Sequence, residues 1–345
     1  MKTALVLGAG GFIGNHIVNR LKADGYWVRG VDVKYNEYQK TKADEFLIYD
    51  LRNSENVNAV VRLDFFEVNG NLTIAPFNYR GNPFTQKKPF DQVYQLAADM
   101  GGAGYINTGL VDADVMQNSA KINLNLVDAA RENNIKNVFF SSSACVYNEN
   151  NQKSTATPDC REHTAYPAMP DSEYGWEKLF SERLYLSYNR QYGMKNKIAR
   201  FHNIFGEYGT WQGGKEKSPA AICRKIALCE DGGTIDVWGD GKQSRSFLHI
   251  DDCVDGIMRL MHSDFSGPVN IGSDNLITIN DLISIVSKIA NKKINVNYIK
   301  GPVGVRGRNS NNDLIHEKLN WKPKQELKKD LTKLYNWIYG EIYGK

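Results

Sequence analysis

Residues 4–14 read Ala-Leu-Val-Leu-Gly-Ala-Gly-Gly-Phe-Ile-Gly, a short apolar run that ends in a glycine turn. Such a run is typical of a strand that is buried on both faces. Residues 15–23 have helical spacing, and residues 26–33 predict a second strand that ends around Asp32. A dinucleotide site is predicted by this order of elements: a strand, a glycine turn, a helix, and a second strand that ends in an acidic residue. The glycines let the backbone approach a pyrophosphate, which binds at the helix N-terminus.

The glycine spacing is Gly8-x-x-Gly11-x-x-Gly14, which departs from the more general GxGxxG pattern. A glycine turn alone is weak evidence, but the complete set of elements favours dinucleotide binding. The carboxylate of Asp32 would accept hydrogen bonds from an adenosine ribose and repel a 2′-phosphate, so we expect NAD rather than NADP. Asp50 ends another predicted strand and is a candidate adenine contact. The residues expected to hold NAD are Gly8, Gly11, Phe12, Ile13, Gly14, Asp32, Asp50, Leu51, Leu96, Ala97, Ala98, Tyr174 and Lys178.

Alternation of strands and helices continues along the chain, with strands predicted at 46–49, 92–98 and 138–140 and a helix over 122–131. Repeated βαβ units predict an α/β fold, a Rossmann-type doubly wound parallel sheet with a smaller C-terminal α/β domain that binds substrate. We expect the NAD-binding domain over residues 1–178. Residues 179–345 would form mainly the substrate domain, with some segments returning to the first domain.

Residues 62–90 interrupt this alternation with Asn, Gly and Pro. We interpret them as an insertion, either a hairpin or a packed surface loop. Its aromatic residues would anchor it to the body of the protein, and an interface is the alternative. These aromatics are Phe65, Phe66, Phe77, Tyr79 and Phe84.

In the second half the pattern predicts helices over 218–228, 278–291 and 327–343 and a strand over 244–250. Loops at 206–217 and 301–308 are rich in glycine and basic residues. Arginines in separate loops, such as Arg306 and Arg308, suit bidentate recognition of a diphosphate. Scattered surface arginines are the alternative.

The composition is that of a globular protein, with 345 residues, 41% hydrophobic and 24% charged. A net charge of +4 without a dense basic block suits a small anionic substrate at least as well as nucleic acid, so we expect no nucleic-acid partner. Five cysteines without a CxxC pair argue against a zinc site or a disulfide framework and favour a cytoplasmic location. We expect no metal and no membrane contact, since no apolar run approaches the roughly 18 residues of a spanning helix. Residues 1–7 are interpreted as a strand rather than a signal peptide.

Tyr174 and Lys178 are spaced Tyr-x-x-x-Lys at the start of a predicted helix that runs to about Tyr192. Positions four apart share a helix face, so the two side chains can serve one site. A nearby ammonium would favour the ionised form of the phenol, whose free pKa is near ~10. Ser143, after the strand at 138–140, could bind the same substrate oxygen. An ordinary amphipathic helix with a surface lysine is the alternative.

Together, Gly8-x-x-Gly11-x-x-Gly14, Ser143 and Tyr174-x-x-x-Lys178 resemble the extended short-chain dehydrogenase/reductase family of nucleotide-sugar enzymes. The resemblance implies transient oxidation at sugar C4, in which Tyr174 takes the hydroxyl proton and NAD takes the hydride. A ketone at C4 acidifies the protons on C3 and C5. In related 4,6-dehydratases an Asp-Glu pair follows the hydroxyl residue, whereas this chain has Ala144-Cys145. Without the acid, expulsion of water from C6 lacks a proton donor, but the thiol can still abstract a proton.

Longer stretches resemble one subgroup of that family, the GDP-mannose 3,5-epimerases, from residue 8 to past residue 310. These stretches are residues 96–102, 142–145, 200–203, 209–217, 238–241 and 305–310. The resemblance implies that Cys145 and Lys217 form an acid/base pair on opposite faces of the sugar. The implied catalytic residues are therefore Ser143, Cys145, Tyr174, Lys178 and Lys217. The implied substrate-binding residues are Gly102, Ser143, Ala144, Cys145, Asn203, Glu216, Lys217, Ser218, Lys225, Trp238, Gln243, Arg245 and Arg306.

An acid/base pair of Cys145 and Lys217 has a physical rationale. Inversion at carbon needs one group to remove a proton and another to deliver one to the opposite face. A free thiol has a pKa near ~8.5, and an ammonium at Lys217 would lower it, so Cys145 is the expected base and the protonated Lys217 the acid. The alternatives are that Cys145 is a small buried apolar residue and Lys217 a solvated loop charge. For His202, a ligand-site role and a packing role remain equally open.

Three other functions remain open from the sequence. A GDP-4-keto-6-deoxymannose epimerase-reductase would consume NADPH, against which Asp32 argues. A GDP-heptose epimerase would bind the same GDP group with a different sugar attached to it. A redox-sensing module would only bind NAD, against which the intact Tyr174 and Lys178 set argues. We also expect a homodimer, since relatives commonly pair through helices of the first domain.

Overall fold

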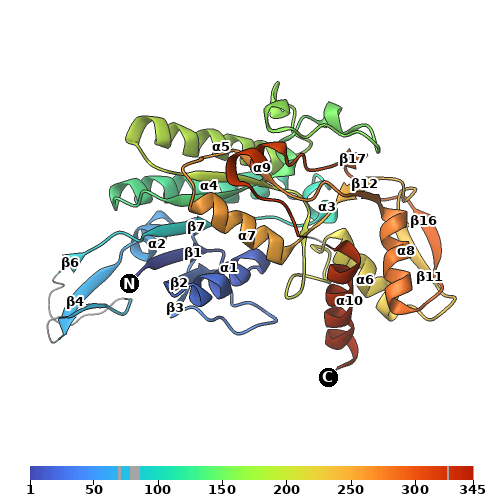
Figure 1. Cartoon of the computed structure of the whole chain (residues 1–345), viewed down its shortest axis with the longest axis horizontal. Helices are drawn as coiled ribbons and strands as arrows, with labels where there is room; N and C mark the ends of the chain where they lie inside the picture. The colour runs from blue at the N-terminus through green and yellow to red at the C-terminus, as the bar shows by residue number, and fades with distance from the viewer. Residues whose placement is uncertain (69–70, 78–85, 325, 345) are drawn as a thin grey trace. The chain divides into compact units, whose positions relative to one another are not determined.

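The computed structural model describes residues 1–68, 71–77, 86–324 and 326–344 (Figure 1). Seven strands form a parallel sheet with the strand order of a Rossmann-type fold, so the predicted fold class is confirmed. In spatial order they are β3 (Glu45–Ile48), β2 (Trp27–Asp32), β1 (Thr3–Leu7), β7 (Gln92–Gln95), β8 (Val138–Ser143), β9 (Lys197–Phe201) and β14 (Val269–Ile271).

Two compact units make up the chain. Unit 1 comprises residues 1–98, 117–140 and 181–197, and unit 2 comprises residues 99–116, 141–180 and 198–345. Two long helices contribute residues to both units, α4 (Asp112–Glu132) and α5 (Glu173–Tyr192). The domain boundary that the sequence places at residue 178 stays a prediction.

Unit 1 contains the glycine turn and its flanking elements. Strand β1 is buried along its whole length and pairs in parallel with β2 and β7. Helix α1 (Phe12–Ala23) lies against these strands in Figure 1 and buries Ile17, Val18 and Leu21. The predicted strand at 4–7 and helix at 15–23 are confirmed, although the helix begins at Phe12. Helix α2 (Ser54–Val60) follows β3.

The insertion forms a small antiparallel sheet within unit 1. Strand β4 (Asp64–Val68) pairs with β5 (Asn71–Ile74) as a hairpin and with β6 (Gln86–Lys87). Phe65 is buried, and the ring of Phe77 lies 5.5 Å from that of Tyr49, so the hairpin and the anchoring role of these two residues are confirmed. Tyr79 and Phe84 lie outside the described residues.

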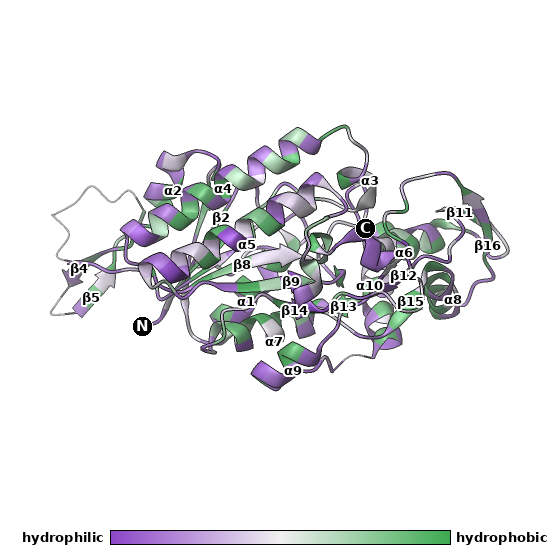
Figure 2. Cartoon of the chain, turned by 90° about the horizontal axis from the view of Figure 1, so that it is seen from above, coloured by the Kyte–Doolittle hydropathy of each residue, from purple (hydrophilic) through white to green (hydrophobic). Residues whose placement is uncertain are grey.

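Unit 2 contains three helices that pack together, α6 (Ser218–Leu228), α8 (Ile279–Ala290) and α10 (Leu327–Tyr343) (Figure 1). Strand β11 (Thr234–Trp238) pairs in parallel with β16 (Asn295–Ile299). Figure 2 shows hydrophobic colouring along α8, whose buried residues include Leu282 and Val286. All three helices match the ranges predicted from the sequence to within one residue, because their apolar spacing is regular.

The strand predicted over 244–250 is wrong in part. Strand β12 (Ser244–Ser246) pairs with β15 (Leu276–Thr278) and β17 (Gly307–Arg308), whereas β13 (Leu248–His249) pairs with β10 (Ile204–Phe205). The chain therefore changes sheets at Phe247, and Ile250 begins helix α7 (Ile250–Met261), which the His249 side chain caps. Helix α4 also begins well before the predicted residue 122, because its first half is polar. The remaining elements are α3 (Ala103–Ile106), α9 (Asp313–Leu319) and the 3-10 turns η1 (Ala144–Val146), η2 (Glu149–Gln152) and η3 (Glu162–Ala165).

Arg29 is a buried cation in the core of unit 1. Its side chain is 2% exposed, and its Nε lies 2.5 Å from Oε2 of Glu45. Its Nη1 donates to the carbonyl oxygens of Val60 and Arg62 at 2.9 and 2.6 Å. Burial lowers the pKa of Arg29, while Glu45 opposes that shift. The carboxylate of Glu45 therefore compensates a charge that water cannot reach.

Replacing Glu45 with alanine should lower the free energy of unfolding by about 3 kcal/mol, because the buried Arg29 would lose its hydrogen-bonded carboxylate and keep only the weaker charge of Asp64. Urea denaturation would measure the change. As a control, Asp24→Ala breaks the surface pair Arg20–Asp24 and should cost less than about 1 kcal/mol. Equal losses in the two variants would contradict a special role for the buried pair.

Candidate active site

The glycine turn in unit 1 has no room for a side chain at Gly8 or Gly14, and only a tight fit at Gly11, where a Cβ would lie 3.2 Å from the Gly8 oxygen. A Cβ on Gly8 would lie 2.7 Å from the Ala97 nitrogen, and one on Gly14 would lie 2.0 Å from the Gly8 oxygen. Gly8 also has a φ of +83°, in the left-handed region. Gly11 precedes α1 and leaves the start of that helix without a side-chain cap. Backbone N–H groups at an uncapped helix start suit a pyrophosphate, so this turn fits a dinucleotide.

Asp32 lies at the end of β2, beside the glycine turn. Its Oδ2 accepts the Gly10 N–H at 2.9 Å, and its Oδ1 accepts the Val33 N–H at 2.7 Å. Burial raises the pKa of Asp32, and these backbone donors oppose the shift. Asp50 pairs with Arg52 at 2.7 Å, and this hydrogen-bonded arginine lowers the pKa of Asp50. Of the apolar residues expected at the cofactor, Leu51 is buried, while Leu96 follows β7 and donates its N–H to the Leu7 oxygen.

A cavity of about 350 Å³ lies within unit 2. Segments far apart in the sequence line it, including the end of β8, the start of α5, and the loops before α6 and β17. Four of the five predicted catalytic residues line it: Ser143, Cys145, Tyr174 and Lys217. Of the predicted substrate residues, those that line it are Gly102, Ser143, Ala144, Cys145, Asn203, Glu216, Lys217, Ser218, Lys225, Trp238, Gln243 and Arg245.

Cys145 sits in the turn η1, which Ser143 caps by accepting the Cys145 N–H at 3.2 Å. All five cysteines of the chain are free thiols. Nη1 of Arg308 donates to the Cys145 sulfur at 3.2 Å. Burial and the charge of Asp171 raise the pKa of Cys145, and Arg308 opposes that shift. The cation that hydrogen-bonds to the thiol is thus Arg308, whereas the sequence suggested Lys217.

Arg308 is held in place by two further partners. Its Nη2 lies 2.6 Å from Oδ2 of Asp171, and its Nε donates to Oε1 of Gln152 at 2.5 Å. Burial would lower the pKa of Arg308, but Asp171 and the thiol of Cys145 raise it, so the guanidinium stays charged. The sequence placed Arg308 in a loop suited to a diphosphate and did not connect it with the thiol. Asp171 and Gln152 belong to no motif, so the sequence offered no signal for them.

Tyr174 and Lys178 lie at the start of α5, as their spacing predicts. The Lys178 Nζ lies 5.6 Å from the centre of the Tyr174 ring and donates to the Ser141 carbonyl at 3.0 Å. Burial, followed by the charges of Cys145 and Glu177, raises the pKa of Tyr174, while a hydrogen bond with Ser143 opposes the shift. The expected lowering is therefore absent in this structure, and the phenol is protonated.

Lys217 is the residue before α6, and its side chain makes no capping hydrogen bond. Among the described residues no hydrogen-bond partner of its Nζ occurs, although it lines the cavity. Burial lowers the pKa of Lys217, and Cys145 opposes the shift. The ammonium of Lys217 therefore gives up its proton more readily than a free lysine does.

Arg306 was expected in the substrate site but is not among the residues that line the cavity. Its guanidinium forms a surface ion pair with Asp240 at 3.0 Å. Arg308, two residues later, lines the cavity, where Gln152, Cys145 and Asp171 bind its guanidinium. His202 is a packing residue: it is buried, its Nε2 lies 2.9 Å from the Asn270 oxygen, and burial lowers its pKa to about 3.

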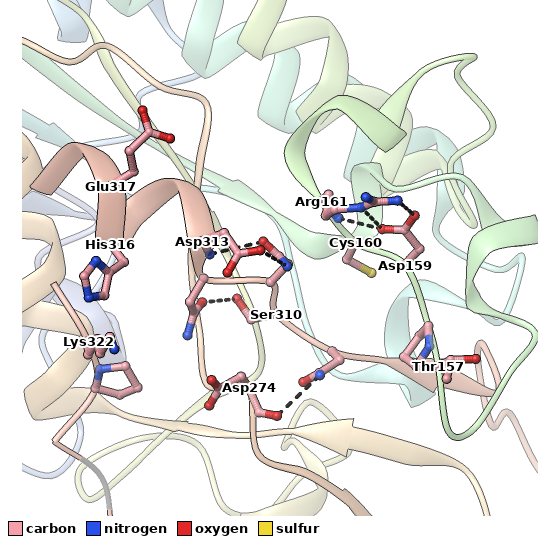
Figure 3. Close-up of a pocket in the computed structure, with 15 residues that line it drawn as sticks. Thr157, Asp159, Cys160, Arg161, Asp274, Ser310, Asp313, His316, Glu317 and Lys322 are labelled. Carbon is pink, nitrogen blue, oxygen red and sulfur yellow. Dashed lines mark hydrogen bonds and ion pairs between the residues drawn. The ribbon is translucent and has the colours of Figure 1, made fainter. Parts of the chain in front are cut away.

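A larger hollow, of about 820 Å³, also lies in unit 2 (Figure 3). Several of its polar groups pair with one another: Asp159 with Arg161, Asn309 Nδ2 with the Asp274 carbonyl, and Ser310 with Asn312. It contains none of the predicted catalytic residues. The smaller cavity is the candidate site, because a thiol, a phenol, an ammonium and a guanidinium converge there.

The family is shown by comparison with known proteins. Residues 4–272 match the model of the NAD dependent epimerase/dehydratase family. The chain belongs to that family. It is an enzyme of the epimerase class, and NAD is the family's cofactor. Among the described residues, no helix has the length and apolarity to cross a bilayer.

Relatives identify the group within the family. The chain is 43% identical over 339 residues to a GDP-mannose 3,5-epimerase of Arabidopsis thaliana, covering 98% of this chain and 82% of the relative. It is 42% identical over the same length to GDP-mannose 3,5-epimerase 1 of Oryza sativa subsp. japonica, with the same coverage. These matches confirm the resemblance predicted from the motifs. A UDP-glucose 4-epimerase of Thermotoga maritima has the same fold, with a TM-score of 0.80, 21% identity and 99% of each chain covered.

Replacing Gly8 with alanine should remove most bound NAD, because the new Cβ would lie 2.7 Å from the Ala97 nitrogen. NAD released from the denatured protein would be measured by absorbance and mass spectrometry. Gly25→Ala is a matched control, since Gly25 has a similar φ of +80° but no atom within 4 Å of the added Cβ. If both variants lose NAD equally, backbone strain rather than crowding explains the loss.

Proposed function

We propose that this enzyme epimerises GDP-mannose at C3 and C5 through a transient ketone at C4. The product would be GDP-L-galactose, or GDP-L-gulose where only C5 inverts. Relatives named GDP-mannose 3,5-epimerase at 43% and 42% identity support the substrate. The observation that carries the proposal is that Cys145 and Lys217 line one cavity together with Ser143 and Tyr174.

The glycine turn, Asp32 and Asp50 would hold NAD, which supplies a hydride acceptor for C4 of the sugar. Ser143 would orient the C4 oxygen by a hydrogen bond, and Tyr174 would accept and return its proton. Because burial raises the pKa of Tyr174, this role requires cationic neighbours to compensate for burial in the loaded site. Lys178 lies 5.6 Å from the Tyr174 ring centre and is one such neighbour.

Cys145 would remove the acidic proton beside the C4 ketone. The thiol is neutral at rest, because burial raises its pKa. As the proton leaves the carbon, the Arg308 donor at 3.2 Å can stabilise the growing negative charge of the thiolate. Asp171 and Gln152 keep that guanidinium fixed, so little reorganisation is needed when the charge appears.

Lys217 would deliver the proton to the opposite face. Its pKa is lowered by burial while that of Cys145 is raised by burial, so the two groups move toward each other in acidity. A pair matched in this way can exchange roles, with one group as acid and the other as base, at two neighbouring carbons. Ala144, between Ser143 and Cys145, cannot donate a proton, which is consistent with epimerisation rather than loss of water.

The outer part of the cavity would hold the GDP group. Oε1 of Gln243 is buried and has no hydrogen-bond partner in the part of the chain that the structure describes, while its Nε2 donates to the Trp238 carbonyl at 3.1 Å. A buried acceptor without a donor is costly, so a donor from a bound ligand would stabilise it. Arg245 also lines the cavity, and burial lowers its pKa to about 10. Both features support an anionic, donor-bearing ligand such as a guanine nucleotide.

Incubation with GDP-mannose in deuterated water tests the proposal. We expect deuterium at C3 and C5 of the sugar and no net NADH, read by NMR, mass spectrometry and absorbance. The Cys145→Ala variant should lose most of this exchange, by at least about 10³-fold, and still oxidise C4. Cys229→Ala is the matched thiol control and should behave like the wild type. No exchange in the wild type would exclude GDP-mannose, and net NADH would exclude an epimerase.

We also propose a homodimer that uses part of helix α5. Trp176 and Phe180 are 40% and 47% exposed, and their spacing of four places them on one face of that helix. Large apolar side chains side by side at a surface favour a protein partner.

In analytical ultracentrifugation the wild type should sediment with twice the mass of one chain. Phe180→Glu should shift it to the monomer. Tyr298→Glu, which changes an exposed aromatic of β16, should remain a dimer. A monomeric wild type, or an unchanged Phe180→Glu, would contradict this interface.

A further inference from the structure

The loop that carries Lys217 packs against the segment Asp99–Ile106, and both belong to unit 2. The Gly102 N–H donates to the Lys215 carbonyl at 3.0 Å. The two backbones are so close that a Cβ on Gly102 would lie 2.5 Å from the Glu216 oxygen. The backbone directly before Lys217 is therefore held against the wall of the cavity.

The side chain of Lys215 adds a second attachment. Its Nζ lies 3.8 Å from the centre of the Tyr105 ring and 3.9 Å from Oδ1 of Asp99. The Tyr105 hydroxyl donates to the same oxygen of Asp99 at 2.9 Å. Burial and Asp99 raise the pKa of Tyr105, so its hydroxyl keeps the proton that it donates. The Tyr105 ring, the Asp99 carboxylate and the Lys215 ammonium thus form one cluster, which we call the Lys215 clasp.

The rest of the loop is conformationally permissive. Gly213 and Gly214 have φ values of +89° and +90°, and a Cβ on either would meet no atom within 4 Å. The carboxylate of Glu216, the residue after Lys215, accepts hydrogen bonds from the Arg224 guanidinium at 2.8 Å and from the Gly214 N–H at 2.7 Å. Because the Nζ of Lys217 has no hydrogen-bond partner among the described residues, the loop backbone must determine where it points.

We propose that Tyr105 and Lys215 are positioning residues, which hold Lys217 where it can deliver a proton to the sugar. This inference rests on the proposed function, in which Lys217 acts opposite Cys145. A cation over an aromatic ring is a directional contact that survives partial exposure, so it can hold a glycine-rich loop without closing the cavity. Asp99 orients the ring and pairs with the cation.

The clasp has a consequence for where the proton goes. If Lys217 is displaced, Cys145 can still remove and return a proton on its own face, because its hydrogen bond with Arg308 involves no clasp residue. The Tyr105 ring packs against the cluster of Val115, Cys145 and Tyr174, so a variant that tests the clasp must change Lys215 and keep that ring. Inversion then slows, while the carbanion returns more often to the starting sugar. In deuterated water, the ratio of deuterium in recovered substrate to deuterium in epimerised product should rise. A general loss of stability would lower the deuterium in the recovered substrate and in the epimerised product together, and would leave their ratio unchanged.

The variant Lys215→Met tests this, because it keeps the length of the side chain and removes the charge. We expect kcat for GDP-mannose to fall about tenfold with KM within about twofold, since a displaced acid costs rate rather than binding. The isotope ratio should rise at least about threefold. Lys215→Arg should restore both values, because a guanidinium also binds an aromatic face. Lys88→Met removes a lysine that lies 5.3 Å from the Phe65 ring in the insertion and serves as the matched control.

Each result of these measurements supports or contradicts the Lys215 clasp. A lower kcat with an unchanged isotope ratio, or no rescue by Lys215→Arg, overturns the clasp. Wild-type values in Lys215→Met overturn it as well. If the wild type itself exchanges no deuterium, the proposed function fails and the clasp fails with it. If the wild type exchanges and only Lys215→Met is unaffected, the proposed function stands and the clasp alone is wrong.

Discussion

The guanidinium of Arg308, bound to a thiol on one side and a carboxylate on the other, is the interaction on which the site depends. Asp171 and Gln152 hold it in place, and its Nη1 donates to the sulfur of Cys145. A buried cation without a carboxylate would be strongly unfavourable, and a buried thiolate without a cation would be equally so. The ion pair with Asp171 therefore makes it possible to keep a charged donor beside the reactive sulfur.

The same electrostatic principle applies to Cys145 and Lys217, the proposed base and acid of the cavity. Burial disfavours charge on both partners, so the pKa of Cys145 rises while that of Lys217 falls. Arg308 limits the rise for the sulfur, and nothing among the described residues hydrogen-bonds to the ammonium. The free pKa values of the two side chains are about 8.5 and about 10.4, so burial shifts them toward each other.

The parts of the fold that could be predicted from sequence are those encoded locally. The glycine turn, Asp32 and the Tyr174–Lys178 spacing each lie within one strand-helix unit, where geometry follows from short-range sterics. Helices α6, α8 and α10 were predicted to within one residue because their apolar spacing is regular. The strand at 244–250 was not, because its break at Phe247 reflects a change of sheet partner, which no local pattern reports.

The surroundings of Cys145 could be predicted only in part. The thiol and Lys217 emerged from a resemblance, whereas Arg308, Asp171 and Gln152 come together from three separate segments. The choice between Arg306 and Arg308 depends on the direction of each side chain, and two arginines in one loop look alike in the sequence. Tyr105 and Lys215 were missed for the same reason, since a cation–π contact across more than a hundred residues has no sequence signature.

The proposed chemistry requires that Cys145 and Lys217 act on opposite faces of one sugar ring. A crystal structure of the Tyr174→Phe variant with NAD and GDP-mannose would test it most directly, because this change removes the proposed proton acceptor and keeps the ring. We expect C5 of the sugar to lie between the two groups, with the Cys145 sulfur and the Lys217 nitrogen each within about 4 Å of it on opposite faces. A sugar with both groups on the same face, or with either group turned out of the cavity, would contradict it.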